Sequence, residues 1–377
     1  MTVSAAIAVA AALVLVYTYV GYPIVIATLA RLFPAPPLRA RGGDEPAPRV
    51  SVLLPVYNGA KYLRAKLDSL LAQDYPAELV DILIYCDGCA DDSEAVARAI
   101  AAEPASGGRI RVIAAAQRRG KPAALNVLQK EATGELLLMN DVRQPFSPNA
   151  VRALAATFAD PAIGCATGLL VLAGGAPSGA YWRYEAWIRR CESRFRGVVG
   201  MTGAIAMTRR ADLVPLPEDL ILDDVWIPAR LALAGKRVVL VTEAEAFDTA
   251  FDDDAEFRRK VRTLAGNYQL FGLLPGLLSP AANPAWLELV SHKLLRLVAP
   301  WAMLVFAASS LTVASGDGAI AWLARLAVAA QLGFYAAALA GKRGGKLAGV
   351  ARTFVVLNAA AVVGLFKHVR GRQRVTW

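Results

Sequence analysis

Histidine and cysteine are scarce in this chain of 377 residues. The two histidines, His292 and His368, both lie beside apolar runs, which excludes a Ser-His-Asp triad or a histidine-rich metal site in the polar middle of the chain. Four cysteines are too few for a disulfide scaffold of this size. The Cys86-x-x-Cys89 motif stands alone, without the second pair of a structural zinc site. This motif could be a redox site or could simply pack at the end of a strand. Because histidine is so scarce, catalysis in this region must use carboxylates and cations.

The sequence also lacks a glycine-rich phosphate-binding motif in the context that such a motif requires. Residues 118–122 contain a Gly-Lys pair, but they lack the upstream glycine and the following Ser or Thr of a P-loop. Residues 316–318 weakly resemble a dinucleotide fingerprint, but they follow an apolar run rather than a strand. The sequence therefore points away from the P-loop and dinucleotide-binding classes.

The composition is more apolar than that of an ordinary soluble enzyme. Hydrophobic residues make up 56% of the chain, and the formal net charge is +10. We therefore expect one soluble domain with hydrophobic ends. The positive charge could suit nucleic acid, but the basic residues lie beside apolar runs, so we expect membrane lipids and no nucleic acid as partners. These basic residues are Lys293, Arg296, Lys342, Arg343 and Lys346.

The amino-terminal segment reads as a retained membrane span. Residues 5–32 are apolar and carry no charge before Arg31, and a spanning helix needs about 20 such residues. A signal peptide fits less well, because no basic region precedes the run and the run is too long. We expect a transmembrane helix over residues 1–33 and a Pro/Gly/Arg-rich linker over residues 34–48.

Residues 49–254 alternate between short strand patterns and helical patterns, which predicts an α/β domain with a mostly parallel sheet. The expected strands cover residues 49–56, 81–86, 109–114, 135–139 and 237–241. Ligands of such sheets bind beyond the carboxyl ends of the strands. Asn58, Asp87 and Asp141 stand at those ends, so we expect the site to be built around them.

The remaining chain is predicted to lie on or in a membrane. Residues 255–292 contain a basic amphipathic stretch suited to the interface. In the carboxyl-terminal region, residues 293–377, two spans are expected over 297–314 and 319–340.

The topology of this region follows from its charges. The loop 315–318 carries no cation, whereas 341–346 carries three, which places the latter in the cytoplasm with the soluble domain. The last apolar segment, 353–366, has basic residues on both flanks, so a re-entrant or interfacial helix is favoured over a further span, and a third carboxyl-terminal span stays open.

Six short motifs follow one another through the α/β region. They are residues 52–58 (VLLPVYN), 73–76 (QDYP), 86–91 (CDGCAD), 120–126 (GKPAALN), 139–143 (MNDVR) and 222–224 (LDD). Their order and spacing resemble the inverting family-2 glycosyltransferases, which have a GT-A fold. The membrane-bound branch with cellulose, hyaluronan and poly-N-acetylglucosamine synthases and ceramide glucosyltransferase is the most similar in appearance. The resemblance covers residues 49–266.

The resemblance implies which residues bind the nucleotide-sugar donor. The first motifs would cradle the base and ribose, Asp91 would support the turn after Asp87, and the cation of Lys121 would offset phosphate charge. The implied donor-binding residues are Pro55, Tyr57, Asn58, Asp87, Lys121, Asn140, Asp141, Arg143 and Arg259.

Asp141 matches the first acid of the family's Asp-x-Asp metal motif, which implies a divalent cation, Mg²⁺ or Mn²⁺, bridging the donor diphosphate. This chain has Arg143 where the second acid would stand. Either Asp141, water and the diphosphate hold the cation, or Arg143 itself offsets phosphate charge.

The acidic pair Asp223-Asp224 matches the family's pair at the start of a helix, so Asp224 would be the general base, although acids at a helix start also serve as plain caps. Residues 259–263 resemble the family's Gln-x-x-Arg-Trp motif. Arg262 would stabilise the leaving diphosphate. Thr263 replaces the tryptophan of the acceptor surface, which weakens the case for processive polymerisation.

Together these features predict an inverting, multi-pass glycosyltransferase of a bacterial inner membrane. It would move a sugar, with a UDP-sugar as the expected donor, to a lipid-linked or polysaccharide acceptor at the cytoplasmic face. Two alternatives stay open. One is a processive polysaccharide synthase, and the other is a non-catalytic sensor or transport protein that binds nucleotide sugars.

Overall fold

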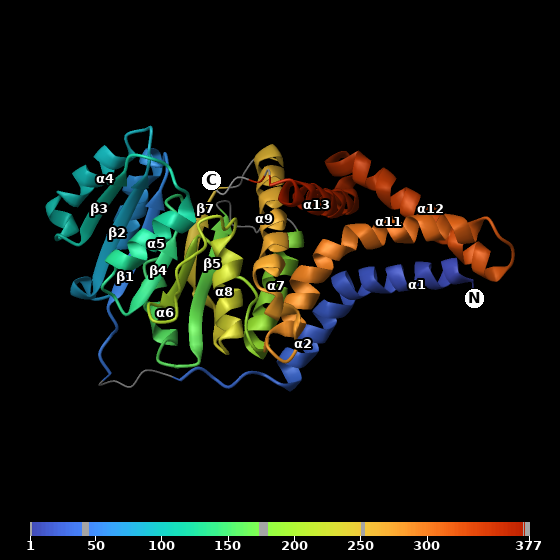
Figure 1. The fold of residues 1–377 in the computed structure, drawn as a ribbon, viewed down its shortest axis with the longest axis horizontal. Helices are drawn as coiled ribbons and strands as arrows, with labels where there is room; N and C mark the ends of the chain where they lie inside the picture. Colours follow the sequence, from blue (N-terminus) through green and yellow to red (C-terminus); the bar gives the residue numbers. More distant parts are fainter. Residues whose placement is uncertain (1, 40–44, 173–179, 250–252, 372, 374–377) are drawn as a thin grey trace.

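A computed structural model of the chain describes residues 2–39, 45–172, 180–249, 253–371 and 373. Figure 1 shows an α/β domain at one end of the molecule and long helices that extend away from it. Residues 40–44 of the predicted linker, and the basic tail after residue 373, lie outside the described residues.

The α/β domain is built on a seven-stranded sheet with the strand order β3-β2-β1-β4-β6-β5-β7. Neighbouring strands run parallel except at β6, which is antiparallel to β4 and β5. The predicted α/β class with a mostly parallel sheet is therefore confirmed. The strands are β1 (Val50–Val56), β2 (Val80–Asp87), β3 (Ile110–Ala115), β4 (Leu136–Asn140), β5 (Ile163–Leu172), β6 (Ile205–Arg209) and β7 (Arg237–Asp248). The sequence analysis identified β1 to β4 and β7 but missed β5 and β6.

Helices cover both faces of this sheet, and the side chains of β1 alternate between them. Val52 and Leu54 belong to the core on one face, whereas Leu53 belongs to the core on the other, as the two-residue period of a strand requires. The first core includes α3 (Ala60–Leu71), α4 (Ser93–Ala101) and α6 (Ala150–Thr157). The second includes α5 (Lys121–Glu131), α8 (Asp223–Leu233) and α9 (Asp253–Leu273).

The first apolar run forms two helices, α1 (Val3–Val16) and α2 (Tyr22–Leu32), joined by a π-helical turn at Tyr17–Gly21. Helix α1 lies beside α11 (Leu295–Ala314), whereas α2 packs on α7 (Ala180–Phe195) of the α/β domain (Figure 1). The amino-terminal run thus binds the domain to the helices that extend from it.

Four helical stretches in the described residues are long and apolar enough to cross a membrane. They are Val3–Leu32, Trp286–Ala314, Ala319–Ala340 (α12) and Gly345–Val369 (α13). Several of their large apolar side chains are exposed, which fits a surface that faces lipid. The helices are consistent with a membrane protein, as the sequence predicts.

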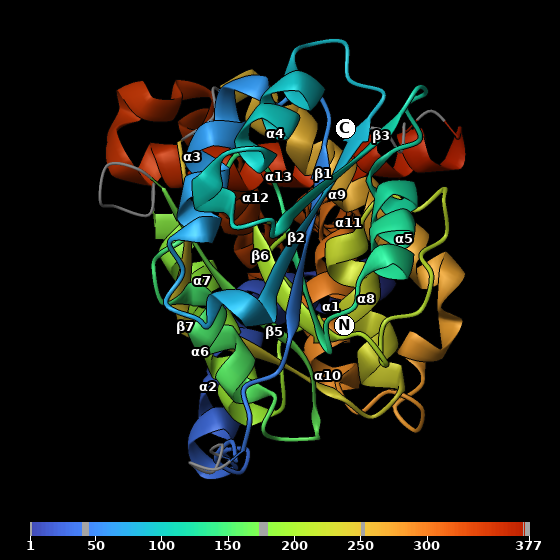
Figure 2. The ribbon, with the colours of Figure 1, turned by 90° about the vertical axis from the view of Figure 1, so that its left-hand side faces the viewer.

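Helix α13 is longer than the predicted segment 353–366, so its length alone would allow a span. Its course is different from that of the other long helices. In Figures 1 and 2 it runs crosswise to α1 and α11 and lies against α9. Gly364 permits the close approach, because a Cβ atom there would lie 3.0 Å from the backbone nitrogen of Ala265. This course suits an interfacial helix, and the topology stays a prediction.

Two glycines of α9 offer a matched test of its packing. A Cβ atom at Gly266 would lie 2.4 Å from Cγ of Leu222, whereas a Cβ atom at Gly272 meets nothing within 4 Å. We expect Gly266→Ala to destabilise the protein, since overpacking costs about 1–3 kcal/mol. Gly272→Ala should be neutral or stabilising by up to ~1 kcal/mol, because alanine is the better helix former. Thermal unfolding in detergent measures both variants, and equal melting temperatures would contradict the packing described.

Candidate active site

Strands β1 and β4 stop pairing at the edge of the sheet where the predicted site residues gather. Their register ends at Leu53 and Met139, although β1 continues beside β2 as far as Val56. Pro55 contributes no backbone N–H to a ladder. Asn140 replaces part of the lost pairing, because its buried amide donates to the Leu53 carbonyl at 3.0 Å. Pro55 and Asn140 thus shape the strand ends, and a direct contact of either with a ligand stays a prediction.

Asp87 holds the loop that leads into α5. Its fully buried carboxylate accepts hydrogen bonds from the backbone N–H groups of Arg119 and Gly120, each at 2.8 Å. Gly88 has φ +61°, and a Cβ atom there would lie 2.5 Å from the nitrogen of Arg118, so this close approach requires glycine. Asp87 positions the loop in front of Lys121, and binding of a base or ribose by Asp87 stays a prediction.

The loops after β1 and β2 are joined by side chains of the first and third motifs. Asn58 has φ +49°, a region that asparagine tolerates better than most residues, and its Oδ1 accepts from the N–H of Ala90 at 2.8 Å. Asp91 accepts from the N–H of Ala60 at 3.1 Å and from Ser93, so it supports this turn as predicted. These bonds pre-organise the loops on which a donor would lie.

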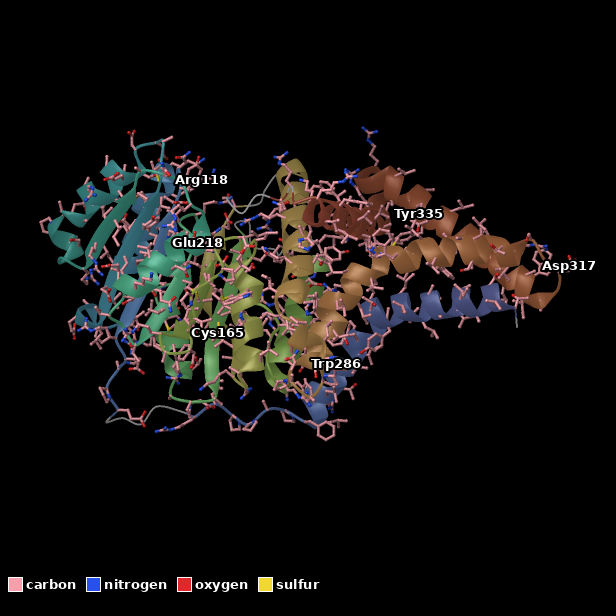
Figure 3. All side chains as sticks on the ribbon, in the orientation of Figure 1. Arg118, Cys165, Glu218, Trp286, Asp317 and Tyr335 are labelled. Carbon is pink, nitrogen blue, oxygen red and sulfur yellow. The ribbon has the colours of Figure 1, made fainter. Side chains whose placement is uncertain are left out.

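Tyr57 and Arg118 together form an aromatic and cationic surface on these loops. The Arg118 guanidinium lies 3.5 Å from the centre of the Tyr57 ring, a cation–π contact. Figure 3 shows Arg118 at the sheet end of the molecule. A planar, positively charged surface of this kind suits a nucleotide, so the predicted role of Tyr57 remains open to test.

Lys121 lies at the centre of the site, at the start of α5. Its Nζ is 2.9 Å from Oδ1 of Asp141, at the end of β4, and 3.1 Å from Oδ2 of Asp223, at the start of α8. Burial alone would lower the pKa of Lys121, but the two carboxylates outweigh burial and raise it above its ordinary value. The ammonium group stays charged and joins three separate segments.

Asp224, the next residue of α8, has a different environment. Its Oδ1 is buried and has no hydrogen-bond partner among the described residues. Burial and the neighbouring Asp223 raise its pKa to about 6, against the opposing effects of Lys121, Lys293 and Arg262. Neither acid caps α8, whose N-cap is Leu222 without a side-chain bond. A carboxylate with an open oxygen and a pKa near neutrality is suited to accept a proton.

The two arginines of α9 differ in their contacts. Arg262 donates to the carbonyl of Ile221 at 3.0 Å, two residues before the acidic pair. Arg259, one turn earlier, forms an ion pair with Glu256 at 3.1 Å. The structure thus brings Arg262 to the start of α8, near Asp224, and donor binding by Arg259 stays a prediction.

Arg143 and Asp141, the two charged residues of the metal motif, have different partners. Arg143 forms an ion pair with the buried Asp248 at the end of β7, and Gln144 donates to the same carboxylate at 2.7 Å. Among the described residues, no three His, Cys, Asp or Glu side chains gather as a metal cage. The side chains therefore supply only part of a cation site. Asp141 would provide one oxygen ligand, and the donor diphosphate and water would provide the other ligands.

Gly203 is a site residue that the sequence analysis missed. It lies on the connection between α7 and β6, and a Cβ atom there would lie 3.4 Å from Oδ2 of Asp141 and 3.5 Å from Nζ of Lys121. Any larger residue would enter the space beside the ion pair. The sequence offered no repeated spacing or charge that marks this glycine, because its importance comes from residues far away in the chain.

Comparison with known proteins places this geometry in a family. Residues 51–213 match the model of "Glycosyl transferase family 2". Proteins named N-acetylglucosaminyltransferase from Mesorhizobium japonicum and Sinorhizobium fredii are each 30% identical to this chain, over 180 and 182 residues. The alignments cover 46% of this chain and 42% and 43% of those relatives, so the match spans less than half of their length.

The whole chain also has a structural counterpart. A mannosyltransferase from Pyrobaculum calidifontis, solved in complex with GDP-Man and Mn²⁺, superposes with a TM-score of 0.76 at 22% sequence identity. The superposition covers 98% of this chain and 100% of that one, including the helices outside the sheet. Residues 51–213 are therefore a family 2 glycosyltransferase domain by their match and their relatives, and the similar structure, at 22% identity, shows the GT-A fold alone.

Proposed function

We propose that the chain transfers one sugar, with inversion, from a nucleotide-sugar donor to a lipid-linked or polysaccharide acceptor at the cytoplasmic face of a bacterial inner membrane. The observation that carries this proposal is the contrast within the acidic pair of α8. Each acid has one buried oxygen without a hydrogen-bond partner among the described residues, but only Asp223 forms an ion pair there, with Lys121 at 3.1 Å, while the pKa of Asp224 is raised to about 6.

The chemistry is a single displacement. Asp224 takes the proton of the acceptor hydroxyl while that oxygen forms a bond to the anomeric carbon. The bond between the anomeric carbon and the diphosphate oxygen breaks, and the nucleoside diphosphate leaves with the electron pair. Lys121 and Arg262 both lie near the acidic pair, where their charges would stabilise the leaving diphosphate. Attack from the opposite side inverts the anomeric centre.

The donor is proposed to be a UDP-sugar bound with Mg²⁺ or Mn²⁺. The relatives named N-acetylglucosaminyltransferase and the similar structure with GDP-Man and Mn²⁺ support a nucleotide sugar and a divalent cation. A hard cation would supply charge neutralisation between the two phosphates. In this chain Asp141 would contribute one oxygen ligand to the cation. Arg143, which pairs with Asp248, would lie next to this cation site.

The proposed orientation rests on charge. Figure 3 shows Asp317 at the tip of the α11–α12 hairpin, at the opposite end of the molecule from Arg118 and Glu218 of the α/β domain. That tip would lie on the far side of the membrane. The basic segment 341–346 returns toward the domain, which is the arrangement that the positive-inside rule favours for a cytoplasmic domain.

Single transfer is favoured over polymerisation. Thr263 stands where processive synthases carry the tryptophan of their acceptor surface, and its hydroxyl donates to the Arg259 carbonyl at 3.0 Å. The threonine therefore serves its own helix and offers no flat surface to a growing chain. A non-catalytic sensor is also less well supported, because it has no use for an open carboxylate at Asp224.

Replacement of the proposed base tests the proposal. Asp224→Asn should lower transfer by about 10²–10⁴-fold, because the acceptor proton loses its base. Affinity for UDP should change little. Release of nucleoside diphosphate measures turnover, and calorimetry with UDP measures binding. The exposed Asp219, five residues away, provides the control Asp219→Asn. Residual transfer within a few-fold of the unmodified chain would reject Asp224 as the base.

The pH dependence follows from the raised pKa of Asp224, about 6. The base works deprotonated, so transfer should be constant above this pKa and should fall about tenfold per unit as the pH drops below it. The rate of transfer at saturating donor, measured between pH 4.5 and 8, checks this limb. The residual activity of Asp224→Asn should not show this fall at low pH. If the fall persists in this variant, it comes from the titration of another group.

Removal of Asp141 tests the proposed cation site. Asp141→Ala should weaken binding of UDP in the presence of Mn²⁺ by about tenfold or more and should weaken it less without the metal, since a charge-assisted contact is lost. Calorimetry with and without Mn²⁺ gives both values. Asp74→Ala, at an exposed acid paired with Arg152, serves as the control. Equal losses with and without Mn²⁺ would show that Asp141 does not act through a cation.

A further inference from the structure

A charged cavity lies between the α/β domain and the long helices. Its volume is about 190 Å³. The walls come from α7, from the connection 199–201, from Lys260 of α9, and from His292 and Lys293 just before α11. In Figure 1, α7 stands between the sheet and the helices α2 and α11. No residue predicted for the donor site lines this cavity.

Both acids of the cavity wall already have partners. Glu185 pairs with Arg296 at 2.6 Å and with Nε2 of His292 at 3.1 Å. Glu192 binds Nδ1 of His292 at 2.6 Å and accepts from the hydroxyl of Tyr22 at 2.6 Å. Burial would raise the pKa of Glu185, but Arg296 and His292 outweigh burial and hold it below its ordinary value. Both oxygens of Glu185 are therefore engaged, whereas Glu192 uses only Oε1 and its buried Oε2 has no hydrogen-bond partner among the described residues.

The cations of the cavity wall are less well compensated. Lys293 has no hydrogen bond or ion pair among the described residues, and Arg189 donates to the Gly200 carbonyl at 3.3 Å. Lys260 is 3.4 Å from Glu256 and lies 5.5 Å from the Trp182 ring. Lys293 and Arg189 have no ion pair among the described residues, although the charges of Glu185, Glu192 and Asp224 offset part of theirs. A buried positive charge without a direct carboxylate partner is costly. An anion that enters the cavity would remove this cost.

The cavity adjoins the proposed base. Gly200 lies between the two: a Cβ atom added to it would be 3.5 Å from Nζ of Lys293 and 3.7 Å from the Asp224 carbonyl oxygen. Met201 donates its N–H to that same carbonyl at 2.8 Å. Lys293 therefore lies beside the backbone of Asp224, and its charge also acts on the Asp224 carboxylate, as does the charge of Lys121.

The cavity also borders the apolar helices. His292 and Lys293 belong to the candidate span Trp286–Ala314, and Tyr22, which anchors Glu192, belongs to Val3–Leu32. A ligand in this position would meet protein cations at one end and lipid at the other. An anionic lipid head group satisfies both conditions, whereas a neutral polysaccharide leaves the cations unpaired.

We propose that this cavity binds the phosphate or diphosphate of a lipid acceptor, with Lys293 and Arg189 holding the anionic group. The lipid tail would extend along the apolar helices, and the acceptor hydroxyl would reach Asp224. This inference rests on the proposed transfer reaction and adds the class of acceptor, a phosphate-bearing lipid. It separates two anion sites, one for the donor at Lys121 and one for the acceptor at Lys293.

Binding of farnesyl diphosphate to the full chain in detergent tests the inference without turnover. Trp182 lines the cavity, so binding should change the tryptophan fluorescence, and Trp182→Phe should remove most of the change. Lys293→Met should weaken binding about tenfold or more, and Lys260→Met should weaken it as well, because each removes a charge-assisted contact. Arg258→Met, an exposed cation on α9, should bind like the unmodified chain.

Three further measurements decide between sources of the signal. Farnesol should bind at least tenfold more weakly than farnesyl diphosphate, and equal binding would overturn the anionic part of the proposal. Inorganic diphosphate should also bind more weakly, and equal binding would overturn the lipid part. The affinity of Lys293→Met for UDP should be unchanged. A parallel loss of UDP binding would show that Lys293 serves the donor or that the variant is misfolded. In that case Lys260→Met is the deciding variant, provided that it binds UDP normally. Normal binding of farnesyl diphosphate by this variant would overturn the proposal.

The same assay separates the inference from the proposed reaction. Asp224→Asn should bind farnesyl diphosphate normally while transfer is lost. If transfer survives in Asp224→Asn but the lysine variants fail to bind the lipid, the reaction scheme is wrong and the lipid site stands. If the lysine variants bind it normally, the lipid site is wrong and the reaction scheme stands.

Discussion

The ammonium group of Lys121 between Asp141 and Asp223 is the interaction on which the site depends. It joins the start of α5, the end of β4 and the start of α8, three segments that the chain order keeps far apart. Without this cation, the two carboxylates would lose the positive charge that both of them contact. The same cation forms an ion pair with Asp223, whereas Asp224 has no ion pair among the described residues.

Several motif residues that resemble ligands act here on the backbone. Asp87 holds the loop of Arg119 and Gly120, Asn140 replaces a missing strand pair, and Asn58 joins two loops. These bonds fix where Lys121 stands before any substrate arrives, which is the pre-organisation that electrostatic catalysis requires. A short motif can therefore mark a site reliably even when its members do not touch the substrate themselves.

The sequence predicted the parts of the fold whose signals are local. Strands β1 to β4 are mostly apolar, and β2 and β4 end in the polar residues Asp87 and Asn140, a pattern that is readable without the rest of the chain. Strands β5 and β6 were missed for non-local reasons. Strand β6 is a short antiparallel insertion between β4 and β5, and β5 contains Gly168, where a Cβ atom would lie 2.3 Å from the Ala244 carbonyl oxygen.

The same limit applies to the site. Asp224 and Lys121 stood in recognisable motifs, but the partner of Arg143, Asp248, lies 105 residues away. His292 was interpreted only as a residue beside an apolar run, and its contact with Glu192 spans 100 residues. Buried ion pairs between distant segments leave no periodic trace in a sequence, so the charged cavity became visible only in the structure.

The ion pairs around His292 also explain why the helices and the α/β domain form one working unit. Tyr22 of α2, Glu192 of α7 and His292 before α11 form one hydrogen-bonded chain. On the other side of the molecule, Gly364 lets α13 pack closely on α9, which carries Arg262. Breaking a buried network of this kind by removing one member leaves an uncompensated charge and is strongly destabilising. The helices therefore do more than attach the domain to a membrane. They pack against α7 and α9, which contribute Arg189 and Lys260 to the wall of the charged cavity.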